Sequence, residues 1–464
     1  MRTIRSTALM ALLWCGAAQA ADPVLSLGGR EWTVHKSTDA RGAARGEADT
    51  PGLWVENATL EMIEPLNSPG REGAFVLAAT FTTERGSCVG LEIGFPGLSG
   101  GDELVIREQT DCVASPDRWK QLAQVARGRG LAKAVRYRIV VRGGARFRDA
   151  DLLAGPAHAN TRVLRALRAM VATPTIDALD TAIREVKARA RSASQVDWPF
   201  ATVQALAAVI DGSTRRDALP GVQIILKALG DRHSWVTVLD DQGRLTANGQ
   251  SVPYRAPQSR LQTLGEQRVA GWLTIPLLVA MGGLEAQDYV NAIKAGLTQG
   301  MDAGACGFIV DLTGHEGGNM WPGLEGLGPL FGADAVVGTF KPGPPWIIHR
   351  RETDGADLWR DDVARLPVAV LLGPKTASSG EAIAVAFSGR PQTAFFGRRT
   401  GGFATSNQNV PLGDGMVAFV MTSEMADRHG RTFPKGLAPA IEDLSDEDAS
   451  LRALAWLRMQ AGCR

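Results

Sequence analysis

The spacing of hydrophobic and polar residues changes twice along the chain. Up to about residue 150, short apolar runs such as 74–81 and 137–141 are separated by glycine and proline, a pattern typical of β-strands joined by turns. We therefore predict a β-rich domain over residues 21–155. This region carries no motif that indicates a chemistry, so we expect it to be an accessory domain.

After the β-rich region, apolar positions recur at helical spacing. Residues 163–171 and 176–186 place apolar side chains three and four positions apart, which favours amphipathic helices. Another helical stretch begins at Asp197 and runs through Ile210. These segments predict a helical subdomain, which we place at residues 156–260.

The last part of the chain alternates between predicted strands and helices. Two mainly apolar runs, 307–312, which ends in an acid at Asp311, and 367–372, have the length and composition of buried strands. Helical segments precede and follow each run. This alternation predicts an α/β core with largely parallel strands over residues 261–464.

The first twenty residues have the three parts of a secretory signal peptide. Arg2 and Arg5 give a positive start, residues 7–18 are mostly apolar, and the segment closes with two alanines around Gln19. We expect cleavage before Ala21 and a periplasmic or secreted protein; a buried N-terminal helix is the alternative. No later segment is long and apolar enough to predict a membrane span.

Charge and cysteine content add two expectations. Lys+Arg and Asp+Glu nearly cancel, at 50 against 49, and no basic run marks a nucleic-acid groove, so we expect no nucleic-acid partner. Exported proteins can oxidise their cysteines. Cys88 and Cys112 either form a disulfide or stay as buried thiols, and Cys306 is expected in the core. The spacings among these three cysteines and Cys463 do not indicate a zinc site.

The strongest chemical signal surrounds Ser378. A predicted buried strand ends at a Gly-Pro turn, small residues follow, and an apolar helix is predicted over 381–387. A serine at such a strand-to-helix turn lies where free backbone N–H groups converge and favour developing negative charge. The alternative is a plain helix N-cap.

Two further segments supply complementary groups. His233 lies in a predicted turn after a helix and has the side chain that most often serves as base to a serine nucleophile. The glycines Gly317 and Gly318 follow a predicted strand, and their backbone can approach a substrate closely. Taken alone, a single histidine is more often structural, and the glycine segment is equally compatible with an ordinary turn.

Taken together, these segments resemble the tail-specific (C-terminal processing) protease superfamily, whose relatives include the tricorn protease core and retinoid-binding repeats. The order and spacing match over roughly residues 160–464. The matching segments are Leu229–Trp235, Asp311–Pro322, Thr376–Glu381, Gly397–Asn407, Leu412–Gly415, Asp427–Gly430 and Gly436–Pro439. The resemblance implies an α/β fold with a ClpP/crotonase-like βαβ-spiral core. No PDZ module is recognisable before this core, so processive recognition of tails is not expected.

The resemblance also implies roles for individual residues. Ser378 aligns with the nucleophile, and the amides of Ser379 and of Gly317 or Gly318 align with the oxyanion hole. No metal or cofactor is implied. Many relatives use a lysine base, but this chain has Phe403 at that position.

A second branch of the superfamily, typified by tricorn, uses a histidine base, and His233 aligns with it. The serine that precedes this histidine in that branch is replaced by Arg232, and the branch's orienting glutamate aligns near Phe433. The group that orients His233 therefore stays open, with Asp427, Glu424, Glu381 and Asp231 as candidates. His315 replaces an asparagine of the family and is expected to be a solvated loop residue.

From these residues we expect an exported serine endopeptidase that cleaves peptides or proteins through an acyl-enzyme on Ser378, with His233 as general base. Two alternatives remain: a catalytically silent binding protein on the same scaffold, and a serine esterase. The residues do not predict the substrate, the cleavage preference or the oligomeric state.

Overall fold

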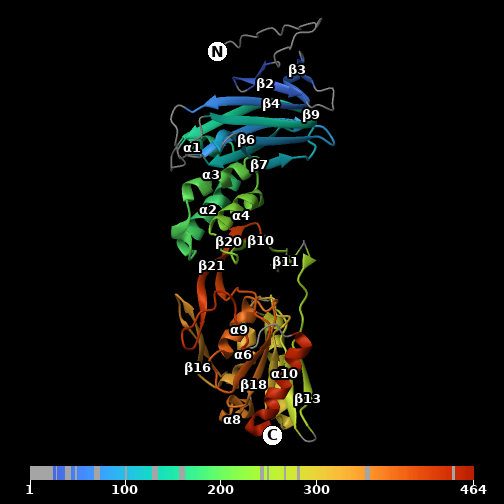
Figure 1. Ribbon diagram of the computed structural model, residues 1–464, viewed down its shortest axis with the longest axis vertical. Helices are drawn as coiled ribbons and strands as arrows, with labels where there is room; N and C mark the ends of the chain where they lie inside the picture. The colour runs from blue at the N-terminus through green and yellow to red at the C-terminus, as the bar shows by residue number, and fades with distance from the viewer. Residues whose placement is uncertain are drawn as a thin grey trace. The chain divides into compact units, whose positions relative to one another are not determined.

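The computed structural model forms two compact units, and each is described by itself (Figure 1). The first unit comprises Met1–Arg184 and Gln195–Ala228, and the second comprises Glu185–Ser194 and Leu229–Arg464. The residues that the structure describes are 24–27, 29–36, 43–47, 50–66, 74–99, 102–127, 134–155, 162–240, 245–247, 250–265, 268–279, 283–350, 356–440 and 445–463. The expected signal peptide, residues 1–20, lies outside them.

The first unit begins with an antiparallel nine-stranded sheet. Its strands are β1 (Val24–Leu27), β2 (Arg30–Lys36), β3 (Ala43–Glu47), β4 (Thr50–Pro65), β5 (Ala74–Thr83), β6 (Cys88–Ser99), β7 (Asp102–Asp111), β8 (Lys120–Arg127) and β9 (Ala134–Gly155). Strand β9 pairs with β4, β5 and β6, so it connects most of the sheet. The predicted β-rich region is confirmed.

One face of this sheet forms a hydrophobic core because its strands alternate. Along β9, Val135, Tyr137, Ile139 and Val141 are buried, whereas the residues between them point to the other face. A disulfide joins Cys88 to Cys112 and closes the β6–β7 region. The open choice between a disulfide and free thiols is thereby decided in favour of the disulfide.

Helices follow the sheet where the apolar spacing predicts them. They are α1 (Arg162–Ala169), α2 (Thr173–Arg189), α3 (Trp198–Ala208) and α4 (Leu219–Ala228), with short 3₁₀ turns η1 (Ala193–Gln195) and η2 (Arg216–Ala218). Asp197 caps α3 by accepting a hydrogen bond from the Phe200 amide at 3.2 Å, and proline follows it. Helices α3 and α4 pack on each other.

The second unit contains a five-stranded sheet in the order β13-β14-β15-β18-β19. The strands are β13 (Gln258–Thr263), β14 (Val269–Thr274), β15 (Phe308–Asp311), β18 (Val368–Leu372) and β19 (Thr393–Gly397). The last four are parallel, and β13 is an antiparallel edge strand. The largely parallel arrangement is confirmed.

Helical crossovers connect the parallel strands, as parallel pairing requires. Helix α5 (Gly283–Asp302) links β14 to β15, and α9 (Ser379–Phe387) links β18 to β19. The connection between β15 and β18 holds α6 (Met320–Gly326), α7 (Gly328–Phe331), η3 (Ala356–Trp359) and α8 (Asp361–Ala364), and the chain ends with α10 (Asp446–Met459) and η4 (Ala461–Cys463).

A second sheet of this unit is antiparallel and pairs β10 (Trp235–Val238), β16 (Ala335–Lys341), β17 (Pro345–Ile348), β20 (Thr405–Gly413) and β21 (Met416–Asp427). A small separate ribbon pairs β11 (Thr246–Ala247) with β12 (Gln250–Ser251). Strand β10 follows His233 almost directly and pairs with β21. His233 therefore belongs to the second unit, whereas the sequence-based boundary had placed it with the helical subdomain.

The parallel sheet is covered on both faces. Phe308, Val310 and Val370 face a core shared with α5, α6, α9 and the second sheet, whereas Ile309 and Ala369 face α10. Burial on both faces explains the continuous apolar runs in the sequence. A disulfide between Cys306 and Cys463 ties the C-terminal turn to this core. The sequence predicted Cys306 in the core but not this bond.

No helix in the described part of the chain is long and apolar enough to cross a membrane.

Candidate active site

Ser378 lies at the turn between β18 and α9. All five residues of β18 are buried, and Ser378 is the N-cap residue of α9 with φ 52° and ψ −112°. This conformation is uncommon for a residue with a Cβ atom and costs about 1–3 kcal/mol, which the surrounding contacts must offset. It places a half-buried serine at the positive end of a helix dipole.

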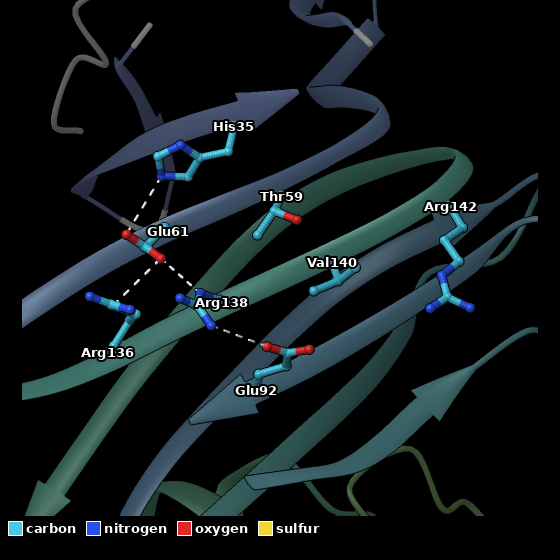
Figure 2. A pocket seen from close by; sticks show the side chains of 8 residues that line it. All are labelled: His35, Thr59, Glu61, Glu92, Arg136, Arg138, Val140 and Arg142. Carbon is cyan, nitrogen blue, oxygen red and sulfur yellow. Dashed lines mark hydrogen bonds and ion pairs between the residues drawn. The ribbon is translucent and has the colours of Figure 1, made fainter. Parts of the chain in front are cut away.

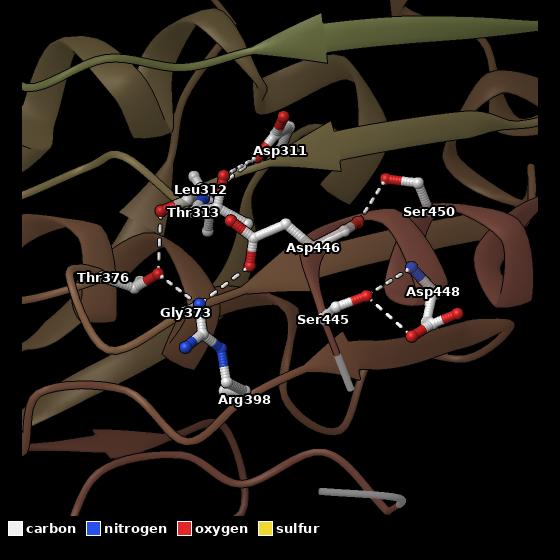
Figure 3. Close-up of polar contacts among 10 residues, drawn as sticks. All are labelled: Asp311, Leu312, Thr313, Gly373, Thr376, Arg398, Ser445, Asp446, Asp448 and Ser450. Carbon is white, nitrogen blue, oxygen red and sulfur yellow. Dashed lines mark hydrogen bonds and ion pairs between the residues drawn. The ribbon is translucent and has the colours of Figure 1, made fainter. Parts of the chain in front are cut away.

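Thr376 fixes the backbone just before Ser378. Its buried hydroxyl donates to the Leu312 carbonyl at 2.7 Å and accepts from the Gly373 amide at 3.0 Å, as Figure 3 shows. The ends of the neighbouring strands β15 and β18 are thus joined through one side chain. Figure 3 also shows an ion pair of 3.0 Å between Arg398 and Asp446, which joins the end of β19 to the start of α10.

Glu381 organises the Ser378 turn rather than the histidine. Its fully buried carboxylate accepts hydrogen bonds from the amides of Ser378 (3.2 Å), Gly402 (3.0 Å) and Phe403 (2.6 Å), and from the Thr400 hydroxyl. Burial raises the pKa of Glu381 above its ordinary value, and these hydrogen bonds oppose that rise. The carboxylate therefore connects the serine turn to the loop before β20.

His315 is buried, although the sequence predicts a solvated loop residue. The side chain is 1% exposed, and burial lowers its pKa to about 4. Its carbonyl accepts the Ala377 amide at 3.0 Å, and a Cβ atom on Gly380 would lie 3.0 Å from its Nδ1. His315 packs beneath the first turn of α9, because the glycine at position 380 leaves room for the ring. It supports the Ser378 turn from inside.

His233 is held in a tight turn after α4. The Asp231 carboxylate accepts the amides of His233 (2.9 Å) and Ser234 (2.6 Å) and the Ser234 hydroxyl (2.9 Å). These bonds shape the backbone, so Asp231 acts on the turn and not directly on the ring. The Asn407 side chain donates to the His233 carbonyl at 2.8 Å and secures the turn against β20.

The imidazole ring of His233 makes its hydrogen bond with Thr405. Nδ1 lies 2.6 Å from Thr405 Oγ1, across 172 residues of sequence. Because Nδ1 is engaged, Nε2 is the nitrogen left for a second partner. Burial lowers the pKa of His233, and the nearby charge of Asp231 opposes this effect. The ring is therefore mainly neutral at pH 7, which is the form that a general base needs.

Phe403 occupies the space beside His233. The two rings have centroids 5.4 Å apart in an edge arrangement, and the guanidinium of Arg232 lies 5.0 Å from the Phe403 centroid. The position where many relatives carry a lysine is thus a hydrophobic support for the imidazole.

The other acidic candidates bond elsewhere. Buried Asp427 accepts hydrogen bonds from the Ser388 hydroxyl (2.9 Å), the His429 amide (2.9 Å) and Arg431 Nε (2.8 Å). Although burial would raise its pKa, these bonds hold it below the ordinary value. Glu424 pairs with Arg191 at 3.3 Å. Among the residues that the structure describes, no hydrogen bond joins either carboxylate to the His233 ring.

Ser378 and His233 line one cavity of about 790 Å³. Gly317, Gly318 and Ser379 line it as well. Gly317 has φ 135°, and a Cβ atom there would lie 3.3 Å from Ser378 Cβ, so a larger residue would crowd the serine. A Cβ atom on Gly318 would overlap the Leu278 carbonyl, so this position also needs glycine. The Ser379 amide, as the first of α9, has no helical acceptor.

The walls of this cavity combine apolar and polar side chains. Trp235 stacks on Phe419 with centroids 4.3 Å apart, and Trp321, which is 48% exposed, lies at another part of the wall. At the rim, Lys375 and Glu316 form an exposed ion pair of 3.2 Å. The cavity therefore offers both apolar surface and hydrogen-bonding groups to a ligand.

Thr405, the hydrogen-bond partner of His233, was not predicted from the sequence. Thr405 lies within a segment that resembles the family, Gly397–Asn407, but nothing in that segment distinguishes it from its neighbours. Only the pairing of β20 with β21, and of β21 with β10, brings its hydroxyl to the ring.

Comparison with known proteins gives matches of limited identity. The chain is 27% identical over 253 residues to the nisin-resistance protein of Lactococcus lactis subsp. lactis, which covers 53% of this chain and 74% of that protein. A lipoprotein from Streptococcus agalactiae superposes with a TM-score of 0.48 and 20% identity, covering 65% of this chain and 98% of the lipoprotein. A photosystem II D1 C-terminal processing protease gives a TM-score of 0.43 and 13% identity, covering 63% and 99%.

A family model matches much of the part of the chain that carries this site, although His233 lies before the matched range. Residues 272–443 match the model of peptidase family S41, and this range holds the Ser378 turn, the glycine loop and Thr405. The match agrees with the mixed α/β content of the second unit. Through residues 272–443 the chain is therefore similar to peptidase family S41, as its motifs predict, and this similarity supports a serine peptidase.

Proposed function

We propose that the second unit is a serine endopeptidase with Ser378 as nucleophile and His233 as general base. His233 Nε2 takes the proton of the Ser378 hydroxyl while Oγ attacks the peptide carbonyl carbon. The amides of Ser379 and of Gly317 or Gly318 hold the oxyanion. The protonated imidazole then gives its proton to the departing amine, and water hydrolyses the acyl-enzyme by the same route.

The observation that carries this proposal is the shared cavity. Ser378, His233 and the two proposed sources of oxyanion donors, which come from three separate segments of the chain, all line it. A purely structural serine and histidine would not need a common opening to substrate. The parallel strands with their helical crossovers further support a ClpP/crotonase-like core.

Thr405 takes the place of an acid in this proposal. With Nδ1–H donating to its hydroxyl, the imidazole is fixed in the tautomer that leaves the lone pair on Nε2. A hydroxyl carries no negative charge, so it stabilises the imidazolium less than a carboxylate does. Glu381 and Asp427 then act as positioning residues, the first for the Ser378 turn and the second for the turn after β21.

Export to the periplasm or the cell exterior is part of the proposal. The signal-like residues 1–20 and the two disulfides support an oxidising compartment. Peptides or proteins are the substrates that family S41 suggests. The name of the Lactococcus relative makes nisin one peptide to test.

A fluorophosphonate probe tests the nucleophile directly. We expect the wild-type chain and the control variant Ser259→Ala, which removes an exposed hydroxyl on β13, to be labelled equally. Ser378→Ala should abolish labelling and reduce peptide cleavage at least about 10⁴-fold.

Two results would contradict the proposal. Labelling that persists in Ser378→Ala would remove the assignment of the nucleophile. A wild-type chain that binds peptides but neither reacts with the probe nor cleaves peptides or esters would instead be a silent binding protein. Cleavage of esters without peptides would make it an esterase.

A further inference from the structure

The first unit contains a second cavity, unrelated to the proposed peptidase activity. It has a volume of about 570 Å³ and lies on the face of the β-sheet opposite the hydrophobic core. Figure 2 shows the side chains that line it, which come from β2, β4, β6 and β9. Six of them are titratable, and we call them the charged face: His35, Glu61, Glu92, Arg136, Arg138 and Arg142.

The charged face follows from the alternation of β9. The buried residues from Val135 to Val141 occupy every second position; Arg136 and Arg138 lie between them, and Arg142 follows Val141 at the next alternate position. An outer strand face needs only polar residues for solubility. Three guanidiniums on one side of one strand concentrate more positive charge than that requirement explains.

Ion pairs hold part of the charged face in place. Glu61 lies 2.7 Å from Arg138, 3.6 Å from Arg136 and 3.5 Å from His35, and Arg138 also lies 3.7 Å from Glu92. Burial tends to raise the pKa of Glu61, but the hydrogen bond from Arg138 and the neighbouring positive charges keep it below the ordinary value. The Arg138 guanidinium, held between two carboxylates, is thereby kept in a fixed orientation.

Arg142 differs from the other two arginines. It is exposed, and its guanidinium makes no hydrogen bond or ion pair with any residue that the structure describes. Three arginines face two glutamates, so the charged face carries one excess positive charge even with His35 neutral. Only short side chains lie between Arg138 and Arg142, because Val140 at that point is paired with Thr59 and Gly90 on the neighbouring strands.

We propose that the charged face binds an extended ligand that carries two or more oxyanion groups, with Arg142 as the principal contact and Arg138 as the second. Guanidinium groups bind phosphate, sulfate and carboxylate oxygens through paired hydrogen bonds. Four residues along a strand separate the two arginines by roughly 13 Å, which is wider than one oxyanion. Among the described lining residues there is no phenylalanine, tyrosine or tryptophan to stack on a neutral sugar.

Calorimetry on the full chain, with inorganic orthophosphate and linear polyphosphate as probes, tests this proposal. We expect polyphosphate to bind at least about tenfold more tightly than orthophosphate, because it can reach both arginines. Arg142→Gln should weaken polyphosphate binding about tenfold, the effect of removing one charge-assisted contact. Arg148→Gln removes the same charge from an exposed position on the same strand outside the cavity and should leave binding within about twofold.

Vesicles distinguish the source of the oxyanion. Binding to phosphatidylglycerol vesicles, lost in Arg142→Gln, with no binding to soluble polyphosphate would assign the ligand to lipid headgroups, whereas the reverse would assign it to a free polyanion. Phosphatidylcholine vesicles are the control. The proposal is overturned if no probe binds, or if Arg142→Gln and Arg148→Gln weaken binding equally. Neither result depends on peptidase activity, so both stand apart from the proposed function.

Discussion

The cavity of the second unit and the charged face of the first unit are assembled in opposite ways. The charged face arises from regular strands whose side chains alternate, with three of its residues on β9 alone. The cavity with Ser378 and His233 is assembled from turns that are far apart in sequence and are joined by buried polar bonds through Thr376, Glu381 and Thr405. We infer that the cavity depends on tertiary contacts much more strongly than the charged face does.

The two disulfides provide the largest test of this difference. Cys306–Cys463 closes a loop of 157 residues, whereas Cys88–Cys112 closes one of 24. In the chain-entropy model, removing the first should destabilise its unit by about 5 kcal/mol and removing the second by about 3 kcal/mol. We expect Cys306→Ser with Cys463→Ser to lower the urea midpoint of the unfolding transition that abolishes probe labelling.

The Cys88→Ser, Cys112→Ser variant is the matched control. It should leave probe labelling of Ser378 unchanged at low denaturant, because its bond lies in the other unit. If it reduced labelling as much as loss of Cys306–Cys463, the inferred difference between the two units would be wrong.

His315 provides the next test, because it is a buried titratable group beneath the Ser378 turn. Its pKa is about 4 in the folded protein and 6.5 for an ordinary histidine, so between these values the unfolded chain binds more protons. The contribution of neutral, buried His315 to the free energy of unfolding is therefore fully present above pH 6.5. As the pH falls toward 4, the free energy of unfolding decreases by up to about 3 kcal/mol. Urea unfolding measured across this range should show the decline.

His315→Asn should remove this part of the pH dependence, because the new side chain does not titrate. His349→Asn is the control, since its imidazole is 69% exposed. An unchanged pH dependence in His315→Asn would show that the ring is not held neutral in the folded protein.

Substitution of Thr405 should have the smallest effect of the three, but it tests a single hydrogen bond. Thr405→Val keeps the volume but removes the hydroxyl that holds His233 Nδ1. We expect kcat to fall about 10- to 100-fold with KM nearly unchanged, since the ring loses its orientation but the cavity keeps its shape. Thr405→Ser should restore most of the activity.

The dependence of kcat/KM on pH separates a positioning role of Thr405 from a purely structural one. In the wild type, kcat/KM should fall as the pH decreases through the pKa of His233, because the imidazolium cannot accept a proton. Burial lowers that pKa, so the fall should lie below pH 6.5. A Thr405→Val enzyme with full kcat, or one that Thr405→Ser does not rescue, would rule out this role.

Much of the fold could be predicted from the pattern of residues. The apolar runs at 307–312 and 367–372 correspond to buried parallel strands, and the helical spacing at 163–171 and 176–186 to helices α1 and α2. These features depend on local periodicity, which the sequence displays directly. The segment around Ser378 also resembles its family strongly enough to identify the strand-to-helix turn.

The candidate site shows where local pattern stops being informative. His315 was expected in solvent, because a histidine among glycines resembles a surface loop, but its burial depends on the absence of a Cβ atom at Gly380. Glu381 and Asp427 were candidates to orient His233, yet the Glu381 carboxylate binds the serine turn and the loop before β20, and the Asp427 carboxylate binds Ser388 and the turn after β21. The partners of a carboxylate cannot be identified from its position in sequence, because Glu381 is bound by amides more than 20 residues away and Asp427 by Ser388.

The sequence by itself determined the classes of element, the residue types at the serine turn and the alternation that creates the charged face, because each of these is a local property of the chain. Only the tertiary structure decided that Thr405 meets His233, that His315 is buried and that Cys306 bonds to Cys463. Such choices depend on which distant segments become neighbours when β21 pairs with β10 and β20, and that pairing is a property of the whole fold.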